Sequence, residues 1–276
     1  MRILLRAHKK GEIRLLGVGI NACMEYSAPS VDGFIRLEGV KDIPLGIDLK
    51  GTDFAGTDYK YQKNLAPFSE KYKKNSDCED AVRLYRRLLS ESQGEIEIVE
   101  VGFLQVFADL LLSVADDISE KNGTELVREK VKKVWVMAGK WDEEGGMEHN
   151  FCNNVRSRNG GEVFCRLCPV PVTFLGFETG IQVVSGDRLS HDDFLYRGFL
   201  DHGSEKGRFS WDPMTALMAV IGDEEKAGYD TVTGRARLDA ATGRNYFDEN
   251  ENGLHKYVKM KFLPGYYADM INAVIN

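Results

Sequence analysis

Glu148 and Asn150 are the first side chains in this sequence whose types and spacing suit chemistry on a small ligand. They follow the apolar run 134–137 and a polar, Gly-rich loop that begins after Gly139. A carboxylate accepts hydrogen bonds, whereas an amide both donates and accepts them, so the pair suits a polyhydroxylated molecule. If the loop is strand-like, side chains two residues apart point to the same side. A solvated loop without a ligand is the alternative interpretation.

A second candidate carboxylate, Asp212, follows Trp211 at the predicted start of a helix that runs to residue 220. Ser210 is the predicted N-cap of this helix, and Pro213 fits its first turn. A carboxylate in the first turn is favoured by the helix dipole, so capping alone explains Asp212. Trp211 is either a core residue or an aromatic platform for a ligand.

Four residues allow a zinc site: His149, Cys152, Cys165 and Cys168. Histidine and cysteine in two closely spaced pairs are compatible with zinc ligation. A helix between the pairs would separate them by up to roughly 20 Å, because each helical residue adds ~1.5 Å of rise. Buried thiols packed under the strand at residue 170 are the alternative. The cysteines number five and are scattered, which argues against a disulfide framework.

Composition narrows the class of protein. Charged residues make up 29% and hydrophobic residues 43% of the 276 residues, as in soluble globular proteins. The net charge of −7 argues against nucleic-acid binding, which needs a basic surface, and suits a neutral or cationic ligand or a metal. There is no run of roughly 20 apolar residues and no signal peptide, so we expect no membrane partner and a cytoplasmic location. GxSxG, P-loop and GxGxxG motifs are absent, so nucleophile-elbow and nucleotide-phosphate interpretations lack support.

Apolar runs and helical stripes alternate along the chain, which predicts one α/β domain over residues 1–276 with a doubly wound, mostly parallel sheet. Strands are expected at 13–20, 43–47, 96–101, 134–137 and 170–174, and helices at 1–10, 28–40, 81–89, 103–114, 125–131, 194–199, 210–220 and 266–275. Ser76 and Glu79 form a predicted capping box before the helix at 81. Residues 231–238 and 257–262 alternate like the strands of a hairpin near the C-terminus. The first predicted element is a helix with no strand before it.

Motifs in a fixed order give nearly the whole chain a resemblance to the inosine-uridine-preferring nucleoside hydrolase family. Residues 134–139 (VWVMAG) resemble the family's V-x-M-[GA]-G strand, and 148–150 (EHN) resemble its E-[FWH]-N motif. Residues 170–180 (VPVTFLGFETG) resemble the following strand, with GFE in place of LDV. Residues 207–213 (GRFSWDP) resemble the late motif that carries an Asp, and 102–106 (GFLQV) line up with G-x-x-T-N.

The resemblance implies hydrolysis of the N-glycosidic bond of ribonucleosides, as in purine and pyrimidine salvage. In the family a Ca²⁺ ion grips the ribose 2′- and 3′-hydroxyls and polarises a water, and an Asp accepts its proton. By this resemblance Asp212 and the backbone carbonyl of Gln105 would be Ca²⁺ ligands, because the ion needs oxygen donors.

The same resemblance assigns the substrate-binding residues. Glu148 and Asn150 would hold ribose hydroxyls, with Met137 against the sugar. Trp211 stands where some members carry a leaving-group histidine, and it would stack on the base. An indole N–H cannot act as a comparable proton donor.

The front of the chain departs from the family pattern. The family begins with a D-x-D-x-G-x-D-D strand that supplies the general base and most Ca²⁺ carboxylates, whereas Met1 falls within the helix that should follow it. No catalytic residue is therefore assigned, and Ca²⁺ binding is expected to be weak or absent. The missing strand would leave a slot in the sheet with unpaired backbone groups.

Two functions follow from this departure. One is a nucleoside hydrolase, N-terminally truncated in this sequence and with impaired or no activity. The other is a non-catalytic nucleoside- or ribose-binding or assembly protein on the same fold. Either would bind a ribonucleoside or related small molecule, and the resemblance predicts a homo-oligomer.

Overall fold

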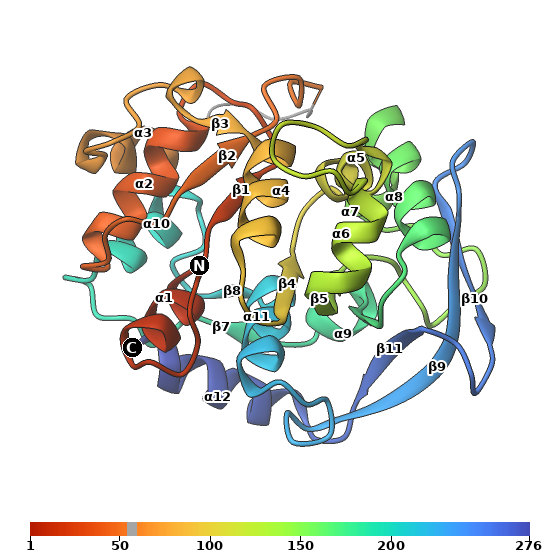
Figure 1. Cartoon of the computed structure of the whole chain (residues 1–276). Coiled ribbons are helices and arrows are strands. Elements are labelled where there is room, and N and C mark those ends of the chain that lie inside the picture. The colour runs from red at the N-terminus through yellow and green to blue at the C-terminus, as the bar shows by residue number, and fades with distance from the viewer. Residues whose placement is uncertain (54–59) are drawn as a thin grey trace.

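The computed structural model describes residues 1–53 and 60–276, whose main strands form two sheets (Figure 1). The smaller sheet is parallel, with the order β1-β2-β3, formed by Val18–Ile20, Leu45–Ile47 and Glu79–Asp80. The larger sheet has the order β10-β9-β11-β6-β5-β4, formed by Arg244–Glu249, Tyr229–Asp239, His255–Met260, Val172–Leu175, Val131–Met137 and Ile96–Glu100. Strands β4, β5, β6 and β11 are parallel, and the β9–β10 hairpin adds two antiparallel strands at one side. A separate small pair joins β7 (Val184–Ser185) and β8 (Arg208–Phe209).

Helices cover both faces of the larger sheet. One core cluster includes residues of α4 (Ala81–Glu91), α5 (Gln105–Leu112), α6 (Gly123–Lys130) and α8 (Val155–Leu167), and another includes residues of α1 (Arg2–Lys9), α11 (Trp211–Ile221) and α12 (Pro264–Ile275). The other helical segments are α2 (Ser27–Leu37), α3 (Lys60–Leu65), η1 (Ala66–Phe68), η2 (Asn75–Asp77), α7 (His149–Cys152), α9 (Phe177–Gly180) and α10 (Phe194–Asp201). No helix in the described part of the chain has the length and apolar character needed to span a membrane.

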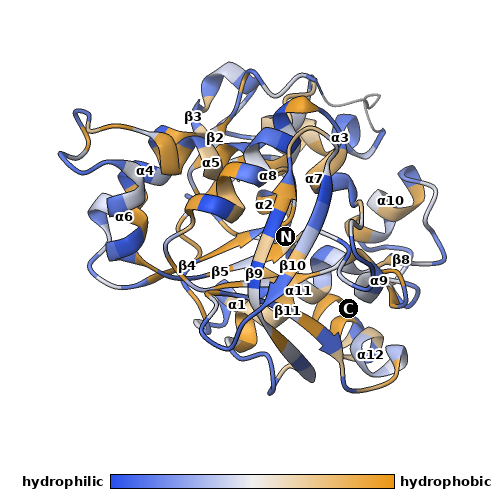
Figure 2. Cartoon of the chain, turned by 90° about the vertical axis from the view of Figure 1, so that its right-hand side faces the viewer, coloured by the Kyte–Doolittle hydropathy of each residue, from blue (hydrophilic) through white to orange (hydrophobic). Residues whose placement is uncertain are grey.

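Strand β5 shows how the sequence builds these layers. Val134 and Val136 belong to the cluster with α5, α6 and α8, whereas Trp135 belongs to the cluster with α11 and α12. Successive side chains of a strand alternate between faces, and all three are fully buried. The Trp135 indole N–H donates to Glu97 Oε2 at 2.7 Å, so the buried ring keeps a polar partner. Figure 2 shows hydrophobic colouring on the central strands and hydrophilic colouring on the outer sides of α4 and α6.

The two sheets leave a slot, defined here as the space between the facing edges of β1 and β4. Strand β1 pairs with β2 and β4 pairs with β5, and no described residue forms a strand between β1 and β4. Residues of β1 and most of β4 are only half-buried, whereas every residue of β6 is buried. The slot that the resemblance implies is therefore present among the described residues.

Polar contacts join the two sheets at the C-terminal ends of β1 and β4. The Asn21 side-chain amide donates to the Phe103 carbonyl at 2.7 Å, and Gln105 Nε2 donates to the Asn21 carbonyl at 2.5 Å. On the α4 side, the Tyr85 hydroxyl donates to Glu100 Oε1 at 3.2 Å. These contacts replace, at the margins of the slot, part of the hydrogen bonding that a continuous sheet would have.

Most predicted elements are present with shifted bounds, two predictions need correction, and one strand was missed. The strand expected at 13–20 is confined to Val18–Ile20. The capping box of Ser76 and Glu79 is wrong, because Asp80 caps α4 through bonds from the Val82 and Arg83 backbone N–H groups. Strand β10 was not expected between the two predicted hairpin strands, since its sequence RNYFDE is mostly polar.

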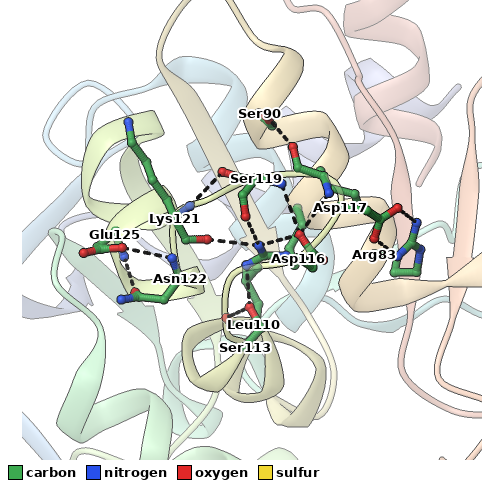
Figure 3. A network of polar contacts seen from close by, with 12 residues as sticks. Arg83, Ser90, Leu110, Ser113, Asp116, Asp117, Ser119, Lys121, Asn122 and Glu125 are labelled. Carbon is green, nitrogen blue, oxygen red and sulfur yellow. Dashed lines mark hydrogen bonds and ion pairs between the residues drawn. The ribbon is translucent and has the colours of Figure 1, made fainter.

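Arg86 of α4 is a buried anchor for the loop between α5 and α6. Figure 3 labels residues of this loop, among them Asp116, Ser119 and Lys121. Its guanidinium donates to both oxygens of Asp116 at 2.9 and 2.7 Å and to Ser113 Oγ at 2.8 Å. It also donates to the carbonyls of Ser119 and Lys121. The hydrogen bonds from Arg86 hold the pKa of Asp116 at about 2.

We expect Arg86→Ala to lower the free energy of unfolding by about 3 kcal/mol, because the loop carboxylate and carbonyls lose a buried cationic partner. Arg83→Ala is the matched control on the same helix, since Arg83 pairs with Asp117 on the exposed side of the same loop. An exposed pair contributes little, so the control should unfold like the parent protein. Urea unfolding followed by circular dichroism tests both variants, and equal losses would contradict the role given to Arg86.

Candidate functional site

A cavity of about 1560 Å³ brings together most of the residues singled out from the sequence. Met137, Glu148, Asn150, Trp211 and Asp212 all line it. They come from the end of β5, the start of α7 and the start of α11. The same cavity is continuous with the slot, because both strand edges also line it. The structure thus places the predicted ligand residues at the carboxyl end of the sheet, where α/β folds bind ligands.

Glu148 is buried and is the N-cap of α7. Its Oε1 accepts from the Asn150 backbone N–H at 2.9 Å, and its Oε2 accepts from the Gly139 N–H at 3.1 Å. The expectation that Glu148 and Asn150 share one side of an extended loop is wrong, because Asn150 lies in a helical turn. Burial raises the pKa of Glu148 to about 7.

The side chain of Asn150 is fixed by the end of β5. Its Nδ2 donates to the Met137 carbonyl at 2.8 Å and lies 3.3 Å from Met137 Sδ. The amide therefore couples α7 to the strand end and places Met137 and Asn150 side by side on the cavity wall.

Trp211 and Asp212 form the opposite part of the lining. The Trp211 indole N–H donates to the Phe177 carbonyl at 2.9 Å, and its ring stacks on Phe177 at 5.5 Å between centroids. Asp212 lies in the first turn of α11, as predicted, and its carboxylate makes no hydrogen bond with the described residues. It is accessible from the cavity yet enclosed by protein, and this desolvation raises its pKa to about 6. Ser210 is the N-cap residue, but its hydroxyl bonds to Ser185 Oγ rather than to the helix.

Gln105, the second predicted Ca²⁺ ligand, is not among the described residues that line this cavity. Its side chain instead reaches Asn21 and lies 3.4 Å from Asp48 Oδ2. Within residues 1–53 and 60–276, no group of three or more His, Cys, Asp or Glu side chains is placed to hold a metal. Ca²⁺ takes about six to eight oxygen ligands, so these donors do not fit the ion expected from the resemblance.

The four residues considered as a zinc site fall into two groups with different surroundings. Cys165 and Cys168 are buried in the core cluster with Phe164, and burial raises the pKa of the Cys168 thiol to about 11. Cys152 and His149 belong to α7, and the helix α8 lies between α7 and Cys168. Zinc binds the thiolate form, which such an apolar environment disfavours, so the buried-thiol interpretation describes these cysteines better.

Several residues of the cavity were not predicted from the sequence. Asn21, Phe177 and Arg208 line it, and the charges of the Met1 amino group and of Arg208 oppose the effect of burial by lowering the pKa of Asp212. The position of Asn21 directly after a strand was the available signal, because strand ends at this edge carry ligand groups. Phe177 likewise follows the end of β6, so the same signal was available for it, whereas Arg208 lies in the two-residue strand β8, which has no periodic pattern.

Comparison with solved structures identifies the fold. An inosine-uridine preferring nucleoside hydrolase from Bacillus anthracis matches over 99% of this chain and 94% of its own, with a TM-score of 0.66 and 14% identity. A purine-preferring ribonucleoside hydrolase from Gardnerella vaginalis matches over 99% and 93%, with a TM-score of 0.64 and 14% identity. The type III effector protein XopQ, solved with adenosine diphosphate ribose, matches over 99% and 88%, with a TM-score of 0.64 and 13% identity. No family model and no curated protein matches the sequence.

The chain therefore has the nucleoside hydrolase fold, a mixed α/β architecture around a mostly parallel sheet. The sequence identities of 13–14% establish this architecture alone. What the cavity binds has to be argued from its own residues.

Glu100, at the end of β4, is a buried acid on the cavity wall that faces Tyr85. Burial raises its pKa from 4.5 to about 7. In the unfolded chain the carboxyl loses its proton near its ordinary pKa, whereas in the folded protein it keeps the proton until about pH 7. The free energy of unfolding therefore falls as the pH rises through this window.

We expect Glu100→Gln to remove this loss, because glutamine keeps an oxygen acceptor for Tyr85 but carries no charge. The variant should exceed the parent by about 2–3 kcal/mol in free energy of unfolding near pH 8 and match it near pH 4. Urea titrations at both pH values measure the difference. Glu95→Gln, at an exposed position one residue before β4, is the control and should unfold like the parent protein at both pH values. A pH-independent offset in Glu100→Gln would contradict the titration of this group.

Proposed function

We propose that this protein binds the ribose of a ribonucleoside, or of a related nucleotide sugar, and cleaves the N-glycosidic bond weakly or not at all. The observation that carries the proposal is the convergence of Met137, Glu148, Asn150, Trp211 and Asp212 on one cavity of the nucleoside hydrolase fold.

The polar groups of the cavity suit vicinal hydroxyls. Asp212 has an uncommitted carboxylate, and each Glu148 oxygen retains acceptor capacity after its one backbone bond. Ionised acids accept hydrogen bonds from hydroxyls more strongly than neutral groups do. With the pKa of Asp212 at about 6, this acid is mostly ionised at neutral pH.

An aromatic wall would receive the base. Trp211 stacks with Phe177, and Phe209 lies 5.4 Å from the Trp211 ring between centroids. The Trp211 N–H is already committed to the Phe177 carbonyl, which fixes the plane of the indole. Stacking on an aromatic side chain tolerates purine and pyrimidine bases alike.

Hydrolysis is the second candidate function, favoured by the fold of the ribonucleoside hydrolases that this chain resembles. That chemistry would need a Ca²⁺ ion, which supplies an activated water when bound. Asp212 is the one cavity acid that the resemblance offers as a ligand, and the described donors do not complete a site. We therefore propose ligand binding as the main function, with impaired cleavage. We also expect the protein to self-associate, as the resemblance predicts.

We expect adenosine, inosine or uridine to raise the melting temperature by several degrees at saturation, because a ligand that binds only the folded state stabilises it. The 2′-deoxy analogues should give a smaller shift, since one hydroxyl is lost. Differential scanning fluorimetry and titration calorimetry measure both. Asp212→Asn keeps the shape of the side chain but removes its charge, and it should weaken ribonucleoside binding at least about tenfold.

Glu144→Gln, in the exposed part of the loop before Glu148, is the control and should bind as the parent does. Release of free base with added Ca²⁺ is followed by chromatography in the same samples. Binding without base release supports the proposal. Turnover that Asp212→Asn abolishes would favour the hydrolase, and the absence of binding by all three nucleosides would refute the ribose site.

A further inference from the structure

Arg208 brings a positive charge to the cavity beside the aromatic wall of the proposed ribose site. It lies one residue before Phe209 and three before Trp211, and all three residues line the cavity. Its charge lowers the pKa of Asp212, because the guanidinium and this carboxylate lie close enough to interact. A cation, an aromatic surface and a carboxylate therefore come from the five consecutive residues 208–212.

The backbone around Arg208 is held in place by the β7–β8 pair. Arg208 pairs with Ser185 of β7. Ser210 shares a hydrogen bond with the same serine, Oγ to Oγ at 2.7 Å, and its backbone N–H donates to the Gly180 carbonyl at 3.3 Å. These bonds fix the point from which the Arg208 side chain leaves the backbone, shortly before α11 begins.

The guanidinium of Arg208 keeps most of its hydrogen-bonding capacity. Within residues 1–53 and 60–276 its side-chain nitrogens are engaged only by His202, where Nη1 donates to Nδ1 at 3.3 Å. No carboxylate in that part of the chain lies within ion-pair distance of it. Burial and the charge of Arg208 both lower the pKa of His202, so the imidazole is uncharged at neutral pH. The exposed guanidinium is therefore available to an anionic ligand.

The chemistry of this cation suits a phosphate. A planar guanidinium binds phosphate oxygens through two parallel N–H···O bonds. The chain carries a net charge of −7, which repels anions, so an anionic ligand needs a cation within its site.

The 5′ carbon of a ribonucleoside is the part that the proposed ribose site leaves unused. In that proposal Trp211 and Phe177 receive the base, and Asp212 accepts hydrogen bonds from the ribose hydroxyls. Nucleotides and nucleotide sugars carry their phosphate on the 5′ carbon. A phosphate held by Arg208 would complete the contacts of the ligand without approaching the acids that bind the hydroxyls.

We propose that the preferred ligand of the ribose site is a ribonucleoside 5′-phosphate, free or within a nucleotide sugar, and that Arg208 selects this phosphate. The inference rests on the proposed ribose site, to which it adds the charge of the ligand and the side chain that recognises it. Asp212 contributes to the selection, because it repels a phosphate placed on the hydroxyl side of the ribose. A nucleoside without phosphate leaves the guanidinium in water and binds more weakly.

The test uses the full chain and titration calorimetry with adenosine and its phosphorylated forms. Adenosine 5′-monophosphate should bind at least about tenfold more tightly than adenosine, because it adds charge-assisted hydrogen bonds to Arg208. Adenosine 3′-monophosphate carries the same charge but places it beside Asp212, so it should bind more weakly than adenosine. Adenosine diphosphate ribose distinguishes the two sources of the phosphate. Tighter binding than that of the 5′-monophosphate assigns a nucleotide sugar, and equal or weaker binding assigns a free nucleotide.

Substitutions of Arg208 test its role directly. Arg208→Gln removes the charge and the planar donor group, and it should reduce the preference for the 5′-monophosphate over adenosine to about one. Arg208→Lys keeps the charge alone and should retain part of the preference. Lys206→Gln is the matched control, because it removes the same charge from an exposed position outside the described cavity lining, and it should keep the full preference. Melting temperatures of the unliganded variants confirm that they are folded.

The outcomes separate this inference from the ribose site on which it rests. Equal binding of adenosine and its 5′-monophosphate by the parent protein would overturn the role of Arg208 and leave the ribose site in place. A preference that persists in Arg208→Gln would overturn that role too. So would an equal loss in Lys206→Gln, or equal binding of the two monophosphates, since both results indicate general attraction of charge. If neither adenosine nor any of its phosphorylated forms binds, the ribose site fails and the inference fails with it.

Discussion

An inner strand of a parallel sheet needs hydrogen-bond partners on both sides. Strands β1 and β4 lack a partner on one side, and much of the structure follows from this. Each has one partner strand among the described residues. The strands therefore form two sheets, with β1 and β4 as the edges that face each other. The half-buried strands, the large cavity and the polar contacts of Asn21 with Phe103 all follow from that interruption. Glu100 at the end of β4 also lines this cavity, and its pKa is raised by burial.

The inner strands of the larger sheet, by contrast, have partners on both sides, and β5 positions the predicted ligand residues. Strand β5 is paired on both sides and buried on both faces, so its end at Met137 is rigid. Asn150 and Glu148 are then held to that end by two hydrogen bonds with backbone groups of Met137 and Gly139, and a third bond joins the two residues to each other. One side of the cavity is thus formed by the end of the doubly paired strand β5, and the other side by the unpaired edges of β1 and β4.

The sequence predicts the apolar parts of this structure well, because burial leaves a periodic pattern. The run 134–137 and the stripe in 81–89 are found as β5 and α4. Polar elements were missed, since β10 is held by pairing with β9 and not by its own composition. The four-residue helix α7 is too short to show a helical period, so the geometry of Glu148 and Asn150 was misjudged. Long-range placement, such as that of Gln105 beside Asn21, depends on where two distant strands end and has no local signature.

The separation of the core into clusters affects how the protein unfolds. Leu45 and Ile47 of β2 pack with Ile35 of α2 in a cluster distinct from the two that cover the larger sheet. Helix α1 nevertheless ties the N-terminal segment to the other layer, because Ile3 packs in the cluster with α11 and α12 and the Arg2 guanidinium donates to Asp193 and to the Ile275 carbonyl. Helix α1 thus contacts two of the three clusters, with Ile3 in one and Leu5 in the other, and it couples the unfolding of the two layers.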